Sequence, residues 1–207
     1  MKKIVTVLAL ALISSGTFAQ FNQGRMLVGG GFNLSVTPNK TETGSTTTKN
    51  GTNTSFGLSP NFGYFVIDNL AVGAALGFSS NFYSYASSSS TYKSTSGSSV
   101  TLTPFVRYYL DPGIFFHVFA GGGGGTSKAK LRNPTPGIND DPEKTGIFTW
   151  GLGAGYAWFL NDFVAVEPML MYSGRSTKYK TPDPNYTSKY SGVSLNVGFQ
   201  IYLGPRN

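Results

Sequence analysis

The last stretch of the chain alternates strictly between apolar and polar residues. One face is entirely apolar and consists of Val193, Leu195, Val197, Phe199, Ile201 and Leu203. The other face consists of Gly192, Ser194, Asn196, Gly198, Gln200 and Tyr202. A strand of a globular sheet has about five to six residues, whereas about 9–11 tilted residues are needed for a strand to cross an outer membrane. The pattern therefore favours a strand that crosses a membrane.

The N-terminus has the layout of a secretory signal peptide. Lys2 and Lys3 precede a short apolar run, and the sequence 17–19 places small residues at positions −3 and −1 of a cleavage site before Gln20. The apolar run is too short for a transmembrane helix of about 20 residues. We therefore expect residues 1–19 to be a signal peptide and residues 20–207 to be one exported domain; the alternative is a buried N-terminal helix.

Composition excludes several classes of protein. The chain has no Cys and a single His, so neither a Cys cluster nor a His-rich site is available for zinc, and we expect no metal and no cofactor. The formal net charge of +7 falls to +5 when Lys2 and Lys3 are removed, and no basic stripe with interleaved aromatic residues is present. Nucleic acid is therefore not an expected partner.

Eight segments of the mature chain are predicted to be strands. The connections between consecutive strands are alternately long and short. The predicted strands are 24–36, 54–66, 70–83, 98–110, 114–127, 146–160, 164–175 and 191–203. The short connections contain Asp, Asn, Pro and Gly, which favour tight turns. The long connections, near 37–53, 84–97, 128–145 and 176–190, are rich in Ser, Thr, Lys and Asn. This layout predicts an all-β fold: an eight-stranded antiparallel up-and-down transmembrane β-barrel with short periplasmic turns and long extracellular loops.

Three prolines fall inside predicted strands, at Pro60, Pro104 and Pro168. Proline cannot donate a hydrogen bond to a neighbouring strand. We expect a β-bulge at each of them, with a weakened seam in the barrel wall as the alternative.

The chain resembles the small eight-stranded outer-membrane barrels, which include the OmpA transmembrane domain, OmpX and the opacity-type proteins. The most specific motif is the C-terminal spacing polar-x-Gly-x-x-apolar-x-apolar, which Asn196, Gly198, Ile201 and Leu203 match. In that family the motif is a barrel-assembly signal. The resemblance therefore implies recognition by the barrel-assembly machinery, a location in the outer membrane of a Gram-negative bacterium, and a monomer.

Three ionisable residues are predicted to face the interior near the periplasmic end. Arg107 and His117 lie at equal distances on either side of the turn at 111–113, and Glu167 lies at a similar height above another turn. We expect a polar layer in which Arg107 pairs with Glu167, because an unpaired buried charge is costly. A salt bridge that plugs the barrel, a gate for a small pore and a catalytic Glu/His pair are the alternatives. The catalytic pair is the weakest, since no inward Ser or Asp accompanies His117.

The external connections are the expected carriers of function. Lys128, Lys130 and Arg132 form a basic stretch that is suited to the phosphates of lipopolysaccharide, and host or phage ligands are equally compatible with such loops. The sequence therefore predicts a non-enzymatic outer-membrane barrel, in contact with lipid and lipopolysaccharide, with a structural or surface-interaction role. A narrow porin-like channel gated by the Arg/Glu layer is the alternative, and a lipid-modifying enzyme at the barrel rim is the third possibility.

Overall fold

The computed structural model describes residues 21–43, 46–86, 90–133, 142–180 and 186–204. The predicted signal peptide, residues 1–19, lies outside the described residues. Within these ranges, no helix has the length and hydropathy that a membrane span requires.

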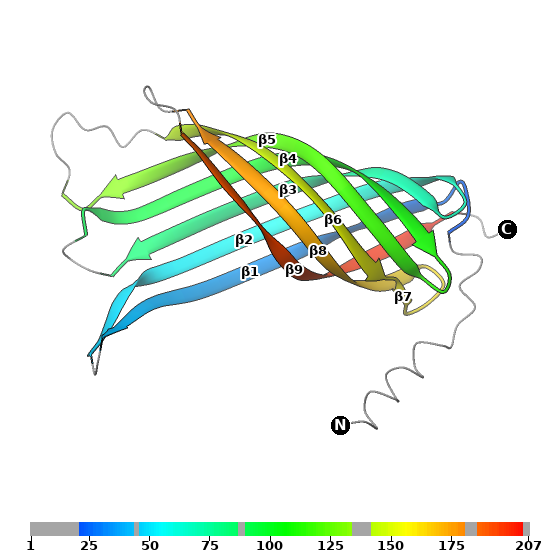
Figure 1. Ribbon diagram of the computed structural model, residues 1–207, viewed down its shortest axis with the longest axis horizontal. Helices are drawn as coiled ribbons and strands as arrows, with labels where there is room; N and C mark the ends of the chain where they lie inside the picture. Colours follow the sequence, from blue (N-terminus) through cyan, green and yellow to red (C-terminus); the bar gives the residue numbers. More distant parts are fainter. Residues whose placement is uncertain (1–20, 44–45, 87–89, 134–141, 181–185, 205–207) are drawn as a thin grey trace.

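The described residues form a single antiparallel sheet that closes into a ring (Figure 1). Its strands are β1 (Met26–Thr43), β2 (Thr46–Ile67), β3 (Leu70–Tyr85), β4 (Tyr92–Leu110), β5 (Ile114–Leu131), β6 (Glu143–Tyr156), β7 (Trp158–Phe159), β8 (Val164–Tyr179) and β9 (Tyr186–Leu203). Both β6 and β7 pair with β8, so these two segments are one interrupted strand of the wall. The ring therefore has eight strands, which confirms the predicted fold.

Tight turns mark one end of the barrel, which we call the turn end. Asn69 adopts a φ of 66° between β2 and β3, and Gly113 a φ of 125° between β4 and β5. Left-handed backbone of this kind is tolerated by Asn and by Gly. The described termini also lie here, since a Cβ added at Gly204 would be 3.2 Å from Cα of Arg25. The other end is called the open end.

The strands extend further toward the open end than the sequence predicts. The predicted loop at 37–53 is mostly strand, because β1 and β2 stay paired as far as Thr43 and Thr46. Likewise, β3 and β4 remain paired up to Ser84 and Ser94. Thr is a favourable strand residue on a half-exposed sheet, and neighbouring strands supply backbone partners, so the ladder continues beyond the apolar part of the wall.

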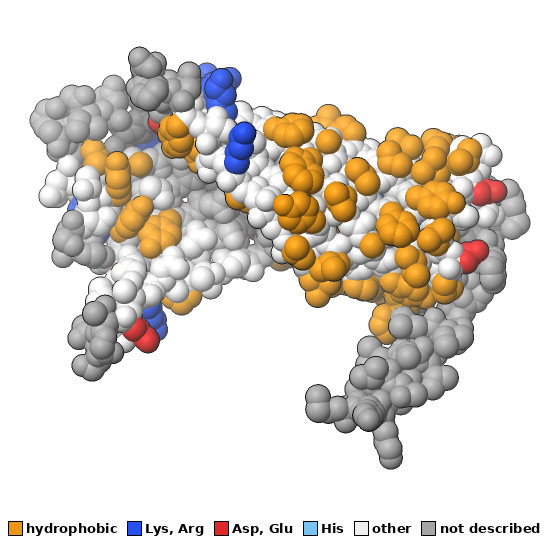
Figure 2. Space-filling view, in the orientation of Figure 1, with side chains coloured by type: hydrophobic (Ala, Val, Ile, Leu, Met, Phe, Trp, Pro, Cys, Tyr) orange, Lys and Arg blue, Asp and Glu red, His pale blue; other side chains and the backbone are white. Residues whose placement is uncertain are grey.

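Side chains alternate between the interior and the outer surface. The outward set is apolar and solvent-exposed on most strands, as at Leu58, Leu76, Leu102, Val118 and Leu195. Figure 2 shows hydrophobic side chains gathered as a belt over the half of the barrel that includes the turn end. An exposed apolar surface of this extent is typical of a wall that faces lipid.

The prediction of bulges at the three prolines is wrong. The register shifts between β1 and β2, β2 and β3, and β4 and β5 lie elsewhere, and the register is the same before and after Pro60, Pro104 and Pro168. The ladder is nevertheless interrupted on one side of each proline, toward β3 at Pro60, toward β5 at Pro104 and toward β6 and β7 at Pro168. Pro60 pairs with Gly30 of β1, and Pro104 pairs with Ala74 of β3. Each proline therefore interrupts the ladder on one side without adding a residue to its strand.

The closure between the first and last strands is short. β1 and β9 pair from Met26 and Leu203 only as far as Gly30 and Phe199. Figure 1 shows the two strands diverging from there toward the open end. We call the gap between residues 31–36 of β1 and residues 193–198 of β9 the seam.

Candidate functional site

The structure brings the three predicted interior residues together. Arg107 of β4 and His117 of β5 are direct cross-strand partners, and Glu167 projects inward from β8. Nη1 of Arg107 donates to Oε2 of Glu167 at 2.6 Å, and Nε of Arg107 donates to Nδ1 of His117 at 3.3 Å. The residues are 4%, 8% and 3% exposed in the order Arg107, His117 and Glu167. They form a buried ionic layer across the barrel.

Two tyrosines complete the ionic layer, and sequence reasoning missed their role. Nη1 of Arg107 also contacts the hydroxyl of Tyr109 at 3.2 Å, which in turn lies 3.0 Å from the hydroxyl of Tyr202. The hydroxyl of Tyr202 donates to Oε1 of Glu167. Both tyrosines occupy positions of their strands that face the interior. The alternation of side chains along β4 and β9 was therefore the sequence signal that could have identified them. The two carboxylate oxygens of Glu167 are thus both hydrogen-bonded.

Aromatic rings surround the guanidinium group of Arg107. Its Cζ lies 4.6 Å from the ring centroid of Phe115 and 5.7 Å from that of Phe105. A ring face attracts a cation, most strongly where water is excluded. The positive charge is therefore held by one carboxylate and two rings, and the layer as a whole carries no net charge.

Buried aromatic rings fill the barrel from the ionic layer toward the turn end. We call Phe21, Phe65, Tyr109, Phe115 and Tyr202 the aromatic plug, and its two tyrosines belong to the ionic layer as well. Phe21 precedes β1 and stacks on Tyr109 at a centroid distance of 4.2 Å. The backbone of Phe21 is fixed as well, because its carbonyl accepts a hydrogen bond from the amide of Asn69 at 2.8 Å.

Arg25 fixes the plug to the last strand. Its Nη2 donates to the backbone carbonyl of Tyr202 at 2.8 Å, and its side chain is fully buried. Arg25 thus lies at the turn end of the barrel.

Two cavities occupy the interior on the other side of the ionic layer. The lower cavity has a volume of about 560 Å³ and reaches Arg107, His117 and Glu167 at its floor. The upper cavity, of about 340 Å³, lies toward the open end. Its lining is dominated by hydroxyl and amide groups, together with three tyrosines.

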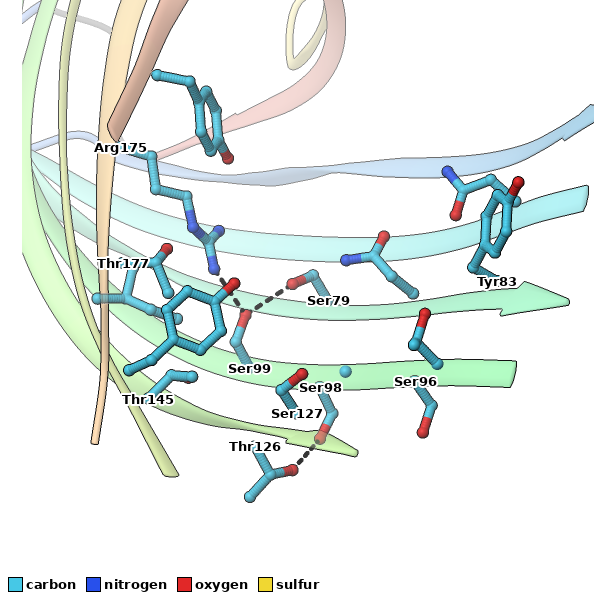
Figure 3. A pocket seen from close by; sticks show the side chains of 17 residues that line it. Ser79, Tyr83, Ser96, Ser98, Ser99, Thr126, Ser127, Thr145, Arg175 and Thr177 are labelled. Atoms are coloured by element: carbon cyan, nitrogen blue, oxygen red, sulfur yellow. Dashed lines mark hydrogen bonds between the residues drawn. The ribbon is translucent and has the colours of Figure 1, made fainter. Parts of the chain in front are cut away.

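Arg175 reaches across the interior where the two cavities meet. Its Nη2 donates to Oγ of Ser99 at 3.1 Å, and Oγ of Ser99 lies 2.7 Å from Oγ of Ser79 (Figure 3). These three residues line both cavities. They form a polar bar from β8 to β4 and β3, and this bar separates the lower cavity from the upper one.

The other predicted site residues lie on the wall. Lys128 and Lys130 are exposed at the open end of β5. Arg132 is half-buried, and its Nη2 donates to the backbone carbonyl of Tyr85 at 3.2 Å. The four residues of the predicted assembly signal all lie on β9, where Ile201 and Leu203 face outward and Asn196 and Gly198 line the lower cavity.

The ionic layer is a closed hydrogen-bonded set, which limits its chemistry. Nδ1 of His117 accepts from Arg107, and both oxygens of Glu167 accept from donors within the layer. A general base needs an acceptor atom that is open to a substrate proton. The geometry is that of a structural tie across a narrow barrel.

Comparison with known proteins gives a family and three similar structures. A model of the outer membrane protein beta-barrel domain matches residues 5–158. The outer membrane protein OprG from Pseudomonas aeruginosa is 12% identical, with 90% of this chain and 99% of that chain covered and a TM-score of 0.48. Neisserial surface protein A is 14% identical, with 86% and 97% covered and a TM-score of 0.42. The translocator domain of the autotransporter NalP from Neisseria meningitidis is 14% identical, with 97% and 67% covered and a TM-score of 0.42. Comparison with curated proteins finds no match.

Proposed function

Because the chain belongs to the outer membrane protein beta-barrel domain family, we propose that it is a non-enzymatic, plugged barrel whose external surface contacts other molecules. The protein is an integral β-barrel of the outer membrane of a Gram-negative bacterium. The turn end of such barrels faces the periplasm and the open end faces the outside.

The observation that carries the proposal is the aromatic plug together with the ionic layer. Phe21, Tyr109 and Tyr202 fill the periplasmic end, and the Arg107–Glu167 pair lies across the interior directly behind them. Movement of the Arg107–Glu167 pair alone would leave the aromatic plug in the path of ions. The alternative, a narrow channel gated by Arg107 and Glu167, is therefore less well supported.

The open end favours a surface-interaction role. The strands carry polar side chains beyond the apolar belt, and the upper cavity is lined by hydroxyls, amides and tyrosines. Lys128 and Lys130 share the parity of the lipid-facing residues Phe116 and Val118 on β5. The two lysines therefore project outward from the wall beyond the belt, where lipopolysaccharide phosphates are the natural counter-charges.

Planar-bilayer recording tests the proposal. The mature protein and its Arg107→Ala variant are reconstituted separately, and conductance is measured across a range of voltages. We expect the wild type to be silent. Steady wild-type conductance that changes in Arg107→Ala would instead establish a channel with the ionic layer as its gate.

An enzymatic role has a separate test. Detergent assays for deacylation of lipid A and for acyl transfer are expected to show no turnover above that of heat-denatured protein. Turnover that the Glu167→Gln variant loses would overturn the non-enzymatic assignment.

A further inference from the structure

The seam interrupts the barrel wall inside the apolar belt. Phe32 and Leu34 on β1, and Leu195 and Val197 on β9, face outward and are exposed on its two sides. The edges of the strands that face each other here have no ladder partner within the described residues. Unpaired backbone is tolerated at membrane depth only where it is buried in protein or lines a polar cavity. The unpaired backbone groups along the seam therefore need hydrogen-bond partners from the interior side.

The lower cavity lies directly behind the seam. Its lining includes Gly31 and Asn33 from β1, and Asn196 and Gly198 from β9, so the cavity reaches both edges. At this place, none of the described strands separates the polar interior from the hydrocarbon of the outer leaflet. A molecule with one polar end and one hydrocarbon tail can satisfy both environments at once.

Two side-chain oxygens that can accept hydrogen bonds flank the end of the seam nearest the turn end, which we call its foot. Gly29 of β1 pairs with Asn61 of β2 on one side and with Gln200 of β9 on the other. Gly29 has no side chain, and a Cβ there would lie 2.1 Å from Oε1 of Gln200. Gln200 is 3% exposed.

These two oxygens are buried without a donor. Oε1 of Gln200 and Oδ1 of Asn61 have no hydrogen-bond partner among the described residues, and both side chains line the lower cavity. Buried acceptors of this kind are normally satisfied. The foot of the seam therefore lacks a hydrogen-bond donor, which a ligand can supply.

The remaining lining sets the charge and the shape of that ligand. Phe105, Phe119 and Met169 give the cavity an apolar side that suits a hydrocarbon. The charges of Arg107 and Glu167 cancel, whereas Arg175 at the polar bar leaves the lining with one positive charge. A cationic head is disfavoured by that charge. Among uncharged groups, a hydroxyl is the smallest that can donate to these oxygens.

We propose that the lower cavity binds a single-chain alcohol that enters from the outer leaflet through the seam. The hydroxyl donates to Oε1 of Gln200 or Oδ1 of Asn61, and the hydrocarbon chain lies between β1 and β9. This site is separate from the external surface on which the proposed function depends.

The first test compares three probes of equal chain length. Isotope-labelled protein in lipid nanodiscs is titrated with 1-decanol, with 1-methoxydecane, whose ether oxygen cannot donate, and with decane. We expect saturable amide shifts at Gly29 and Gly198 with the alcohol, and about threefold to tenfold weaker binding of the other two probes, as loss of one hydrogen bond implies. Equal shifts with all three probes, or none, would overturn the proposal.

Variants assign the hydrogen bond. Gln200→Leu and Asn61→Leu are expected to reduce or abolish the preference for the alcohol over the ether. Asn81→Leu is the matched control, because Asn81 lines the upper cavity. An unchanged preference in both cavity variants, or an equal loss in Asn81→Leu, would contradict the proposed site.

Disulfides test the route, since the chain has no cysteine of its own. Continuing the register beyond Gly30 and Phe199 brings Phe32 opposite Val197, so the pair Phe32→Cys and Val197→Cys holds the seam shut when oxidised. The pair Val28→Cys and Ile201→Cys is the control, because these residues are already paired. Decanol shifts are expected to disappear in the first variant and persist in the second. Persistence in the first oxidised variant would exclude entry through the seam.

Discussion

Arg107 on β4 and Glu167 on β8 meet inside the barrel with 2.6 Å between Nη1 and Oε2, although 60 residues separate them in the chain. Both side chains are almost completely buried, so neither charge is compensated by bulk water. A buried charge without its partner is strongly unfavourable. Each residue therefore depends on the other, and the pair ties together two strands of the wall that are separated by β5 and β6.

The first prediction concerns this ion pair. Arg107→Met and Glu167→Gln are each expected to lower the free energy of unfolding by about 3–5 kcal/mol, because each leaves one buried charge uncompensated. The double variant Arg107→Met/Glu167→Gln should lose less than the sum of the two. Urea unfolding of protein in lipid vesicles, followed by tryptophan fluorescence, measures the three values. Strictly additive losses would show that the two charges do not stabilise each other.

The second prediction concerns the aromatic plug. The double variant Phe21→Ala/Tyr109→Ala removes the stacked pair of rings at 4.2 Å, which leaves a large void at the periplasmic end. Because eight-stranded barrels are filled by their interior side chains, we expect this variant to show conductance events that the wild type lacks. Planar-bilayer recording measures them.

The control for the plug uses outward-facing neighbours. Tyr108→Ala/Phe116→Ala removes two exposed rings from the same two-strand region of the wall. This control is expected to stay silent. Silence in both double variants would mean that the ionic layer alone seals the barrel.

Part of the site follows from local sequence. A tight turn at 111–113 fixes the register of the strands on either side, so Arg107 and His117 are predictable cross-strand partners. The alternation of side chains likewise fixes which residues face inward. For this reason the fold class and the inward set of the ionic layer are predictable from a single chain.

The rest of the site depends on distances around the ring. Whether Tyr202 meets Glu167, and whether Phe21 stacks on Tyr109, is decided by the stagger between strands that are distant in sequence. The alternation within one strand contains no information about that stagger. The seam was missed for the same reason, since the extent of β1–β9 pairing involves the two most distant strands of the chain.

The third prediction compares two glycines in neighbouring strands. A Cβ at Gly123 would lie 1.9 Å from the backbone carbonyl oxygen of Val100, whereas a Cβ at Gly146 meets no atom within 4 Å. Gly123→Ala must therefore push β4 and β5 apart, and we expect a loss of about 1–3 kcal/mol in the free energy of unfolding. Gly146→Ala should be neutral or stabilising by up to about 1 kcal/mol. Urea unfolding measures both, and equal effects would contradict the close approach of β4 and β5.

The fourth prediction concerns lipopolysaccharide. Lys128 and Lys130 are exposed on the outward side of β5, and exposed ion pairs contribute about 0.2–1 kcal/mol each. Lys128→Gln/Lys130→Gln is therefore expected to retain lipopolysaccharide about threefold to tenfold more weakly, as measured by co-purification and by titration in detergent. The difference should shrink at high salt, because screening weakens exposed charge pairs.

Two further variants separate charge from structure at this site. Lys128→Arg/Lys130→Arg keeps both positive charges and should retain lipopolysaccharide as the wild type does. Arg132→Gln loses the hydrogen bond to the carbonyl of Tyr85, so its main effect is expected on the stability of the open end. If Arg132→Gln reduced lipopolysaccharide retention as much as the lysine pair does, while the free energy of unfolding stayed unchanged, the contact surface would have to include Arg132. Retention that is unchanged in all three variants would place the surface-interaction role elsewhere on the open end.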